Sequence, residues 1–232
     1  MKVIPIIPTL NPTEKLLEVL DLLEERGYSK IIVVDDGSNN KEIFEKIKEK
    51  SEIILLTHDV NKGKGCALKT AYKYYLENIK GYNGVITLDD DLQHNIEDVL
   101  KISNMLEDNN MFIIGTRLFN TDSTPRRNKM GNRIASLLFK ALYGINIKDT
   151  QTGLRAIPNY LIPKMIEISG DRFEYEMNVL AEMAMMNEKI FQVDIQTVYL
   201  KNSNKTSHFK PIRDSLKVCG ILFKRKRKNK KL

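Results

Sequence analysis

The 232-residue chain carries 37 Lys and Arg against 30 Asp and Glu, which gives a formal net charge of +7 at pH 7. Seven of these basic residues lie at positions 224–232, where no acid occurs, so residues 1–223 are formally neutral and bulk charge excludes a nucleic-acid-binding body. A content of 42% apolar and 29% charged residues is typical of a globular protein and excludes the disordered and fibrous classes.

The first half of the chain alternates short β-rich runs with longer helical patterns, which predicts a mostly parallel sheet covered by helices. Strands are predicted at residues 3–7, 31–34, 53–56, 85–88 and 112–114. Between the first two strands a helix is predicted to begin at a cap on Asn11, with Pro12 in its first turn and Glu14 at capping-box spacing. Gly27 is expected to end it.

The apolar stripe of that first helix consists of Leu16, Leu20 and Leu23. Further helices are predicted at residues 41–50, 66–78, 96–108, 130–143 and 174–186. From about residue 120 the regular alternation stops, and the polar stretch 120–128, which contains Pro125, is predicted to be a loop. No internal repeat and no linker divides the chain.

The features that indicate a cellular location are weak but consistent with one another. Cys66 and Cys219 have neither metal-site nor disulfide-framework spacing, which fits a reducing compartment. Residues 1–8 lack the long apolar core of a signal peptide, and no apolar run approaches the ~18 residues of a membrane span. We expect a cytoplasmic protein, a location that leaves it free to bind a membrane surface.

Four of the predicted strands are followed directly by polar segments. These segments are PTLN at 8–11, DDGS at 35–38, DDDLQH at 89–94 and GTR at 115–117. Asp, Gly and Ser are also ordinary turn and cap residues, so each segment alone is weak support for a site. Ligands in open α/β sheets bind beyond the carboxyl ends of the strands, and four polar ends on one edge favour a binding site there.

The acidic run after the fourth strand is the most informative of these segments. Three crowded carboxylates repel one another, and a divalent cation relieves that repulsion. Asp89 and Asp91 are two residues apart, so on an extended turn they point the same way while Asp90 points elsewhere. Two carboxylates with diphosphate oxygens are a usual way to hold Mg²⁺ or Mn²⁺. The alternative is an acidic cap on the following helix.

A glycine- and lysine-rich turn, NKGKG at 61–65, follows the third strand and opens a helix. Its backbone amides and lysines are placed to face phosphate. It has neither P-loop spacing nor the position of a dinucleotide fingerprint after the first strand. The alternative is a tight turn with solvated lysines.

In combination these motifs resemble family 2 glycosyltransferases with the GT-A fold, and within them the dolichyl-phosphate or polyprenyl-phosphate sugar transferases. The motifs that carry the resemblance are IPTLNP at 7–12, VVDDGS at 33–38, NKGKGCAL at 61–68, TLDDDLQH at 87–94, GTR at 115–117, DTQTGLRAI at 149–157 and FEYEM at 173–177. They follow the family's order.

The resemblance implies an α/β, Rossmann-like, mostly parallel sheet flanked by helices. It implies a glycosyltransferase domain over residues 1–210, with a nucleotide-sugar-binding half at 1–118 and an acceptor half at 119–210. Residues 211–232 would form an amphipathic and polybasic C-terminal segment. The expected activity moves a sugar from a nucleotide-diphosphate donor, of the GDP-mannose or UDP-glucose type, to an acceptor with inversion.

The resemblance also implies roles for individual residues. The nucleotide would be held by Pro8, Thr9, Asp35, Asp36, Lys64 and Asp90. The metal on the diphosphate, Mg²⁺ or Mn²⁺, would be held by Asp89, Asp91 and Gln93. Catalysis would use Asp91, Asp149, Glu176, Arg117 and Arg133. The family's second acidic motif would include Asp149, Gly153 and Arg155, and Glu176 would lie on a helix below the sugar site. The alternative for Arg117 and Arg133 is that they are surface arginines. The alternative for Glu176 is a solvated helix face.

The acceptor phosphate would contact Arg117, Arg133, Ser207 and His208. Dolichyl-phosphate enzymes typically carry Gly-Glu-Ser-Lys here, whereas this chain reads KTSHFKPIRD at 205–214, so Ser207 is retained and His208 replaces the lysine. A His here could contact phosphate or lie on the surface.

The chemistry of the acceptor decides which side chains are needed. A polyprenyl phosphate is already an anion and needs no strong base, so arginines should line its side of the site, as those at 117, 126, 127 and 133 could. A saccharide or other hydroxyl acceptor, as in cell-surface polysaccharide synthesis, needs a carboxylate base. Asp149, Glu174 and Glu176 are the candidates for that base.

The C-terminal segment provides an independent hint about the acceptor. An apolar helical stripe is predicted after Pro211, formed by Ile212, Leu216, Cys219, Leu222 and Phe223, and the seven basic residues follow it. Such a segment suits the surface of an anionic membrane, where each cation contributes ~1 kcal/mol. We expect a peripheral protein on the cytoplasmic face of the membrane. The alternative is a core-packed helix with a solvated end.

Two other functional classes fit less well. A sugar nucleotidyltransferase would show a GxGTR-like turn after the first strand, where this chain has PTLNP. A nucleic-acid-binding protein would leave the acids at 35–36 and 89–91 unexplained, and weak salt-sensitive binding through the tail would not identify one. We therefore expect no specific nucleic-acid partner.

Overall fold

The computed structural model of the chain describes residues 1–117 and 126–196, and the side chains of residues 126–129 lie outside that description. Seven strands are present in the described part: β1 (Val3–Thr9), β2 (Ile31–Asp35), β3 (Ile53–Thr57), β4 (Gly84–Thr87), β5 (Phe112–Arg117), β6 (Arg155–Pro158) and β7 (Ile190–Ile195). The helices are α1 (Lys15–Glu25), α2 (Glu42–Lys48), α3 (Lys64–Asn78), α4 (Ile96–Asn109), α5 (Arg126–Tyr143), α6 (Ile162–Glu167) and α7 (Glu174–Met185), with a 3₁₀ turn at Asn159–Leu161.

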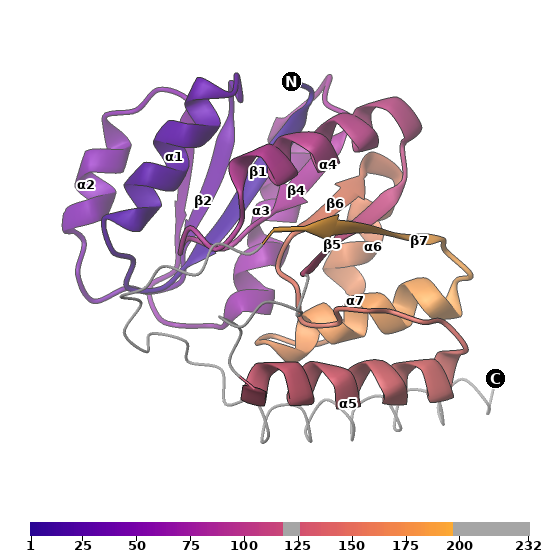
Figure 1. Ribbon diagram of the computed structural model, residues 1–232. Coiled ribbons are helices and arrows are strands. Elements are labelled where there is room, and N and C mark those ends of the chain that lie inside the picture. Colours follow the sequence, from indigo (N-terminus) through magenta and orange to yellow (C-terminus); the bar gives the residue numbers. More distant parts are fainter. Residues whose placement is uncertain (118–125, 197–232) are drawn as a thin grey trace.

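The strands form one sheet in the order β3-β2-β1-β4-β6-β5-β7 (Figure 1). Neighbours β3, β2, β1 and β4 are parallel, as are β5 and β7. Strand β6 runs antiparallel between β4 and β5. The strands before residue 118 and those after it therefore share one sheet, and the carboxyl ends of β1, β2, β4 and β5 lie on the same edge.

Helices cover both faces of the sheet, so most of its strands are buried on both sides. One core packs α3, α6 and α7 against side chains such as Ile4 and Ile6. The other packs α1, α2 and α4 against alternate side chains of the same strand, Val3 and Ile7. This alternation is the period of two that an extended chain imposes. The α/β class predicted from the sequence is confirmed.

All five predicted strands and the six predicted helices are present, with ends shifted by a few residues. The stripe of Leu16, Leu20 and Leu23 is fully buried. Gly27 follows α1 with a φ of +81°, a left-handed conformation that favours glycine, so its helix-ending role is confirmed. Strands β6 and β7 and helix α6 were not predicted.

Two local predictions were wrong. Asn11 does not cap α1, which begins at Lys15 without a side-chain cap. Instead, the backbone amide of Asn11 donates to Ser38 Oγ at 2.8 Å, and Asn11 Oδ1 accepts from the backbone amide of Asn39 at 2.9 Å. Asn11 thus joins the end of β1 to the turn after β2.

The predicted loop at 120–128 also ends early, because α5 already begins at Arg126.

Candidate active site

The polar residues that follow β1, β2, β4 and β5 meet at the carboxyl edge of the sheet, as the sequence predicts. Thr9 closes β1 and is buried, and its hydroxyl donates to Asp90 Oδ2. Pro8, next to it, is buried within the same strand. The hydroxyl bond fixes the acidic turn after β4 against the end of β1, and these two segments form the centre of the site.

The two aspartates after β2 are buried and engaged within the protein. Asp35 accepts from the Ser38 amide at 2.8 Å and pairs with Lys41. Asp36 accepts from the backbone amides of Lys62 and Gly63, at 2.9 and 2.7 Å, and from His58 Nδ1 at 2.7 Å. Asp36 therefore holds the NKGKG turn in place, and contacts with a nucleotide would come in addition to this role.

His58 is a member of the site that the sequence analysis missed. Its Nε2 lies 2.9 Å from Thr70 Oγ1 on α3, and its other ring nitrogen contacts Asp36. The imidazole thus ties the end of β2 to the helix that the NKGKG turn opens. A buried histidine with two polar partners is recognised only in three dimensions, because its partners are 22 and 12 residues away.

Lys64, the first residue of α3, lies between two carboxylates. Its Nζ is 2.7 Å from Asp89 Oδ1 and 2.9 Å from Glu176 Oε1 on α7. Burial alone would lower the pKa of this ammonium, but the two carboxylates outweigh burial and raise the pKa well above its ordinary value. The lysine therefore stays charged and links the acidic turn to α7.

Asp89 also contacts the second acidic motif. A Cβ added at Gly153 would lie 2.5 Å from Asp89 Oδ2, so only glycine leaves room for the carboxylate in this position. Burial would raise the pKa of Asp89, but Lys64 and then His94 outweigh burial and hold the pKa well below its usual range. Asp89 is therefore an ionised carboxylate with a fixed orientation.

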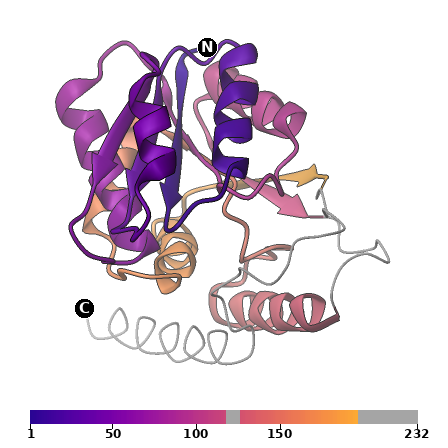
Figure 2. The same ribbon diagram turned by 90° about the vertical axis from the view of Figure 1, so that its left-hand side faces the viewer.

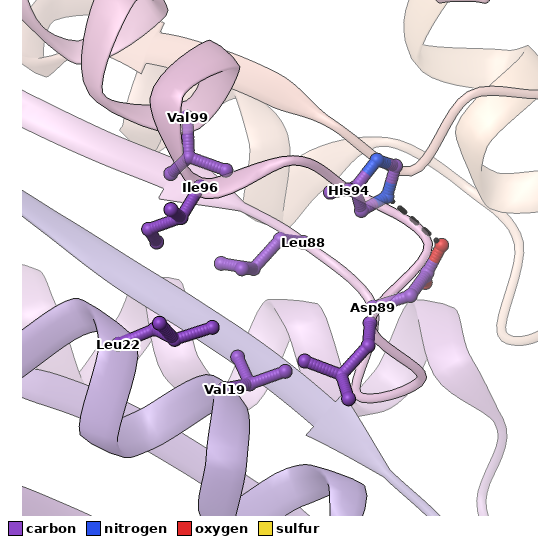
Figure 3. Close-up of a pocket in the computed structure, with 8 residues that line it drawn as sticks. Val19, Leu22, Leu88, Asp89, His94, Ile96 and Val99 are labelled. Atoms are coloured by element: carbon purple, nitrogen blue, oxygen red, sulfur yellow. Dashed lines mark ion pairs between the residues drawn. The ribbon is translucent and has the colours of Figure 1, made fainter. Parts of the chain in front are cut away.

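His94 also contacts Asp89, with its Nε2 3.4 Å from Asp89 Oδ2 (Figure 3). The imidazole is almost fully buried, above a small apolar cavity between α1, α4 and the end of β4. Asp89 and His94 line this cavity together with six apolar side chains, those of Val19, Leu22, Leu88, Leu92, Ile96 and Val99. His94 therefore closes the apolar core beneath the acidic turn and supports Asp89 from that side.

The other two carboxylates of the acidic turn are held less tightly. Burial raises the pKa of Asp90 to about 6, the hydrogen bond from Thr9 opposes this shift, and Asp89 and Asp91 add to it. Burial and then Asp89 also raise the pKa of Asp91. The backbone amide of Gln93 donates to Asp91 Oδ1 at 3.1 Å. Asp90 and Asp91 thus form an acidic pair whose charge is incompletely compensated by the protein.

This part of the site fits a divalent cation. Asp89, Asp91 and Gln93 offer hard oxygen donors, and a cation would offset the two causes that raise the pKa of Asp91, burial first and then repulsion by Asp89. Within residues 1–117 and 130–196, no group of three or more Asp, Glu, His or Cys side chains is arranged to hold an ion. A cation bound here would take its further ligands from water and a bound diphosphate.

On the far side of the site, Arg117 and Asp149 form a bidentate pair. Arg117 Nε lies 2.6 Å from Asp149 Oδ2 and Nη2 lies 3.0 Å from Oδ1, with Asp149 fully buried. Glu176, another predicted catalytic carboxylate, is 8% exposed and bound to Lys64. The structure thus engages all three of Arg117, Asp149 and Glu176 in ion pairs, with Arg117 bound to Asp149 and Glu176 bound to Lys64.

The remaining predicted acceptor residues lie either on the surface or outside the described residues. Arg133 lies on the exposed side of α5, whereas Asp149 is bound by Arg117. Ser207, His208 and the predicted amphipathic segment lie outside the described residues. Arg155 of the second acidic motif is buried, and its Nη1 donates to the Glu176 backbone carbonyl at 2.6 Å. Arg155 therefore positions the start of α7 beneath the site.

Comparison with known proteins agrees with this geometry. Residues 6–216 match the model of the family described as glycosyl transferase family 2. The chain is 30% identical over 220 residues to UDP-N-acetylglucosamine--dolichyl-phosphate N-acetylglucosaminyltransferase of Methanococcus voltae, covering 85% of this chain and 86% of that protein. It is 26% identical over 231 residues to glycosyltransferase AglJ of Haloferax volcanii, covering 97% and 72%.

Among solved structures, glucosyl-3-phosphoglycerate synthase of Mycobacterium tuberculosis in complex with Mn²⁺, UDP and phosphoglyceric acid superposes with a TM-score of 0.71 at 16% identity. The match covers 97% of this chain and 78% of that one, and at this identity it indicates a shared fold. The family match and the 30%-identical relative show that this chain belongs to glycosyl transferase family 2, and the shared fold confirms a glycosyltransferase with the GT-A fold.

Proposed function

We propose that the enzyme transfers a sugar from a nucleotide-diphosphate donor to a polyprenyl phosphate, with a divalent cation and with inversion. One observation carries the choice of acceptor. The three carboxylates that could act as a base toward a hydroxyl acceptor are all engaged by the protein. Asp149 is bound by Arg117, Glu176 by Lys64, and Glu174 accepts from the Asp171 amide at 3.0 Å. A phosphate acceptor is already an anion and needs no such base.

The donor would lie along the carboxyl edge of the sheet, with its nucleotide toward Pro8, Thr9 and the turn after β2. Asp89, Asp91 and Gln93 would hold Mg²⁺ or Mn²⁺ on the diphosphate, where the cation would stabilise the negative charge of the leaving group. Lys64, whose pKa is raised, remains positively charged beside that position. The contribution of the protein is then orientation of the two substrates and electrostatic stabilisation.

The acceptor phosphate would lie on the side of Arg117. Asp149 holds the Arg117 guanidinium in one orientation through two bonds, so its direction is fixed before substrate binds. The name of the Methanococcus voltae relative, which contains dolichyl phosphate, supports this acceptor. The UDP in the solved synthase complex supports a nucleotide-diphosphate donor. Ser207, His208 and Arg133 remain proposed additional contacts.

The predicted location follows from the same acceptor. None of the helices within the described residues is long and apolar enough to cross a bilayer. Residues 211–232 combine an apolar stripe with seven basic side chains, which supports attachment to an anionic membrane surface. Residues 1–210 would form the transferase domain and residues 211–232 the attachment segment.

The proposal is tested by a transfer assay that pairs a panel of UDP- and GDP-sugars with a short polyprenyl phosphate and, separately, with saccharide acceptors. We expect transfer to the phosphate that requires Mn²⁺ or Mg²⁺ and falls at least about 100-fold in Asp91→Ala. Full activity in the presence of a chelator would contradict the metal assignment. Transfer to saccharide hydroxyls alone would contradict the acceptor assignment.

A further inference from the structure

His58 is a buried residue that the proposed reaction does not use. It follows β3 directly, and its side chain is only 6% exposed. Both ring nitrogens nevertheless have polar partners. Nδ1 lies 2.7 Å from Asp36 Oδ1, and Nε2 lies 2.9 Å from Thr70 Oγ1. The imidazole therefore connects the turn after β2 with α3 from inside the protein.

The direction of these two hydrogen bonds follows from what Asp36 already binds. Asp36 accepts from the backbone amides of Lys62 and Gly63. A carboxylate oxygen can only accept, so the proton between Asp36 and His58 belongs to Nδ1. In the neutral imidazole Nε2 then has no proton, and it accepts from the Thr70 hydroxyl. One chain of hydrogen bonds thus runs from Thr70 through His58 to Asp36 and on to the NKGKG turn.

The NKGKG turn that Asp36 holds is closely packed against other segments of backbone. A Cβ added at Gly37 would overlap the Val60 carbonyl carbon, so the turn after β2 contacts the chain just before the NKGKG turn. A Cβ added at Gly63 would overlap the Asp171 carbonyl oxygen, so the loop before α7 contacts the NKGKG turn itself. Because neither neighbour leaves space, a shift of Asp36 must also shift the NKGKG turn.

Asp36 and the NKGKG turn both belong to the proposed donor site, Asp36 as a nucleotide contact and the turn through Lys64. Helix α3, which Lys64 opens, covers the face of the sheet opposite to α1 (Figure 2), and His58 secures the start of this helix to the sheet edge. Lys64 Nζ is held separately, by Asp89 and Glu176. A loosened turn should therefore disturb the seating of the nucleotide, while the charge of Lys64 stays beside the leaving group.

We infer that His58 is a positioning residue for the donor nucleotide, because its bond to Asp36 keeps the NKGKG turn in the geometry that binds the nucleotide. The bond to Asp36 carries this role, since hydrogen bonds to a charged group are stronger than those between neutral groups. The ring touches no reacting atom, so its loss should raise the donor KM and leave kcat nearly unchanged. The inference rests on the proposed function for the donor site and not for the acceptor.

Two substitutions separate the bonds of His58, since Asn places its amide nitrogen as many bonds from the backbone as Nδ1, and Gln as many as Nε2. His58→Gln loses the bond to Asp36, whereas His58→Asn keeps it. In the full chain with Mn²⁺, we expect His58→Gln to raise the dissociation constant of UDP or GDP, measured by calorimetry, and the donor KM about tenfold. The kcat should stay within about twofold, and His58→Asn should stay within about threefold of the wild type in all three quantities.

Tyr28→Phe is the matched control, because it removes a buried hydrogen bond, 2.6 Å long to Ser103, at the sheet edge opposite to the site. Its unfolding free energy should fall while its nucleotide affinity stays that of the wild type. A folded His58→Gln with wild-type affinity and KM would overturn the inference, as would equal losses of affinity in His58→Gln and His58→Asn. His58→Ala, which also loses the bond to Asp36, is the second variant. If neither it nor His58→Gln folds while Tyr28→Phe does, His58 serves folding alone and the inference is wrong.

The same measurements separate this inference from the proposed function. If the wild type transfers only to saccharide hydroxyls, the proposed acceptor is wrong, while the difference in nucleotide affinity between His58→Gln and His58→Asn persists. If the wild type binds neither UDP nor GDP, the donor site and the role of His58 are both wrong.

Discussion

Replacing Gly153 with alanine tests whether the position of Asp89 controls the reaction. The added Cβ would lie 2.5 Å from Asp89 Oδ2 and 2.9 Å from Oδ1. Because an ordinary contact of this kind needs about 3.4 Å or more, the carboxylate must retreat by about 1 Å. That shift moves the oxygen now 2.7 Å from Lys64 Nζ and displaces a proposed metal ligand.

Displacements of this size cost roughly 100-fold in rate when they misplace a catalytic group. We therefore expect Gly153→Ala to lose about 100-fold in transfer rate and to need more Mn²⁺ for half-maximal activity. The overpacking should cost only about 1–3 kcal/mol of unfolding free energy. The assay measures the initial transfer rate across a Mn²⁺ titration, together with a urea unfolding curve for each variant.

Gly144→Ala is the matched control, because it changes stability without touching the site. Gly144 has a φ of +76° and nothing within 4 Å of an added Cβ, so alanine there costs about 1–2 kcal/mol through backbone strain alone. Its transfer rate should stay close to that of the wild type. If Gly153→Ala is folded and keeps both the wild-type rate and the wild-type Mn²⁺ dependence, the proposed role of Asp89 is wrong.

Two further predictions concern the buried charges of the site. Burial raises the folded-state pKa of Asp90 from the ordinary value of 3.8 to about 6, so its contribution to stability is full below pH 3.8 and is lost as the pH rises through 6. The unfolding free energy of Asp90→Asn relative to that of the wild type should therefore increase by about 2–3 kcal/mol from about pH 4 to pH 8. Urea unfolding in the presence of chelator measures this difference at each pH. A difference that does not change with pH would contradict the prediction. Arg117→Met leaves the fully buried Asp149 without its ion pair and should lower the unfolding free energy by about 3–5 kcal/mol. The double variant Arg117→Met with Asp149→Asn should regain most of that stability but not the transfer activity. A double variant as unstable as the single one would show that the pair does not explain the loss.

The sequence predicted the parts of the fold that depend on local pattern. Strands β1 to β5 are continuous apolar runs followed by polar turns, and this pattern is enough to place Thr9, Asp89 and Arg117 on one edge. Strand β6 could not be predicted in the same way, because its four residues begin with Arg155 and end in Pro158, so they form no continuous apolar run. Its place between β4 and β5 is decided by pairing with residues about 40 to 70 positions away, which no local pattern encodes.

The candidate site was predictable in composition but not in pairing. The sequence places acids and bases at the correct edge, yet it cannot say that Asp36 binds the NKGKG turn or that Asp149 is occupied by Arg117. A polar residue at a strand end serves either a ligand or another segment of the protein, and the choice depends on which segments the fold brings together. The contact of Gly153 with Asp89 is of the same kind, since 64 positions separate the two residues.

The charges of the site explain why the acceptor side needs positive charge from outside the centre. Lys64 is shared by Asp89 and Glu176, and Arg117 is paired with Asp149, so these cations are already balanced. A donor diphosphate brings about two negative charges, which one divalent cation cancels. The phosphate of a lipid acceptor then adds negative charge that no described ion pair offsets. The net positive charge of the chain lies at 224–232, the segment proposed above to attach to the membrane, so the cations that attract the bilayer also favour the approach of its phosphate.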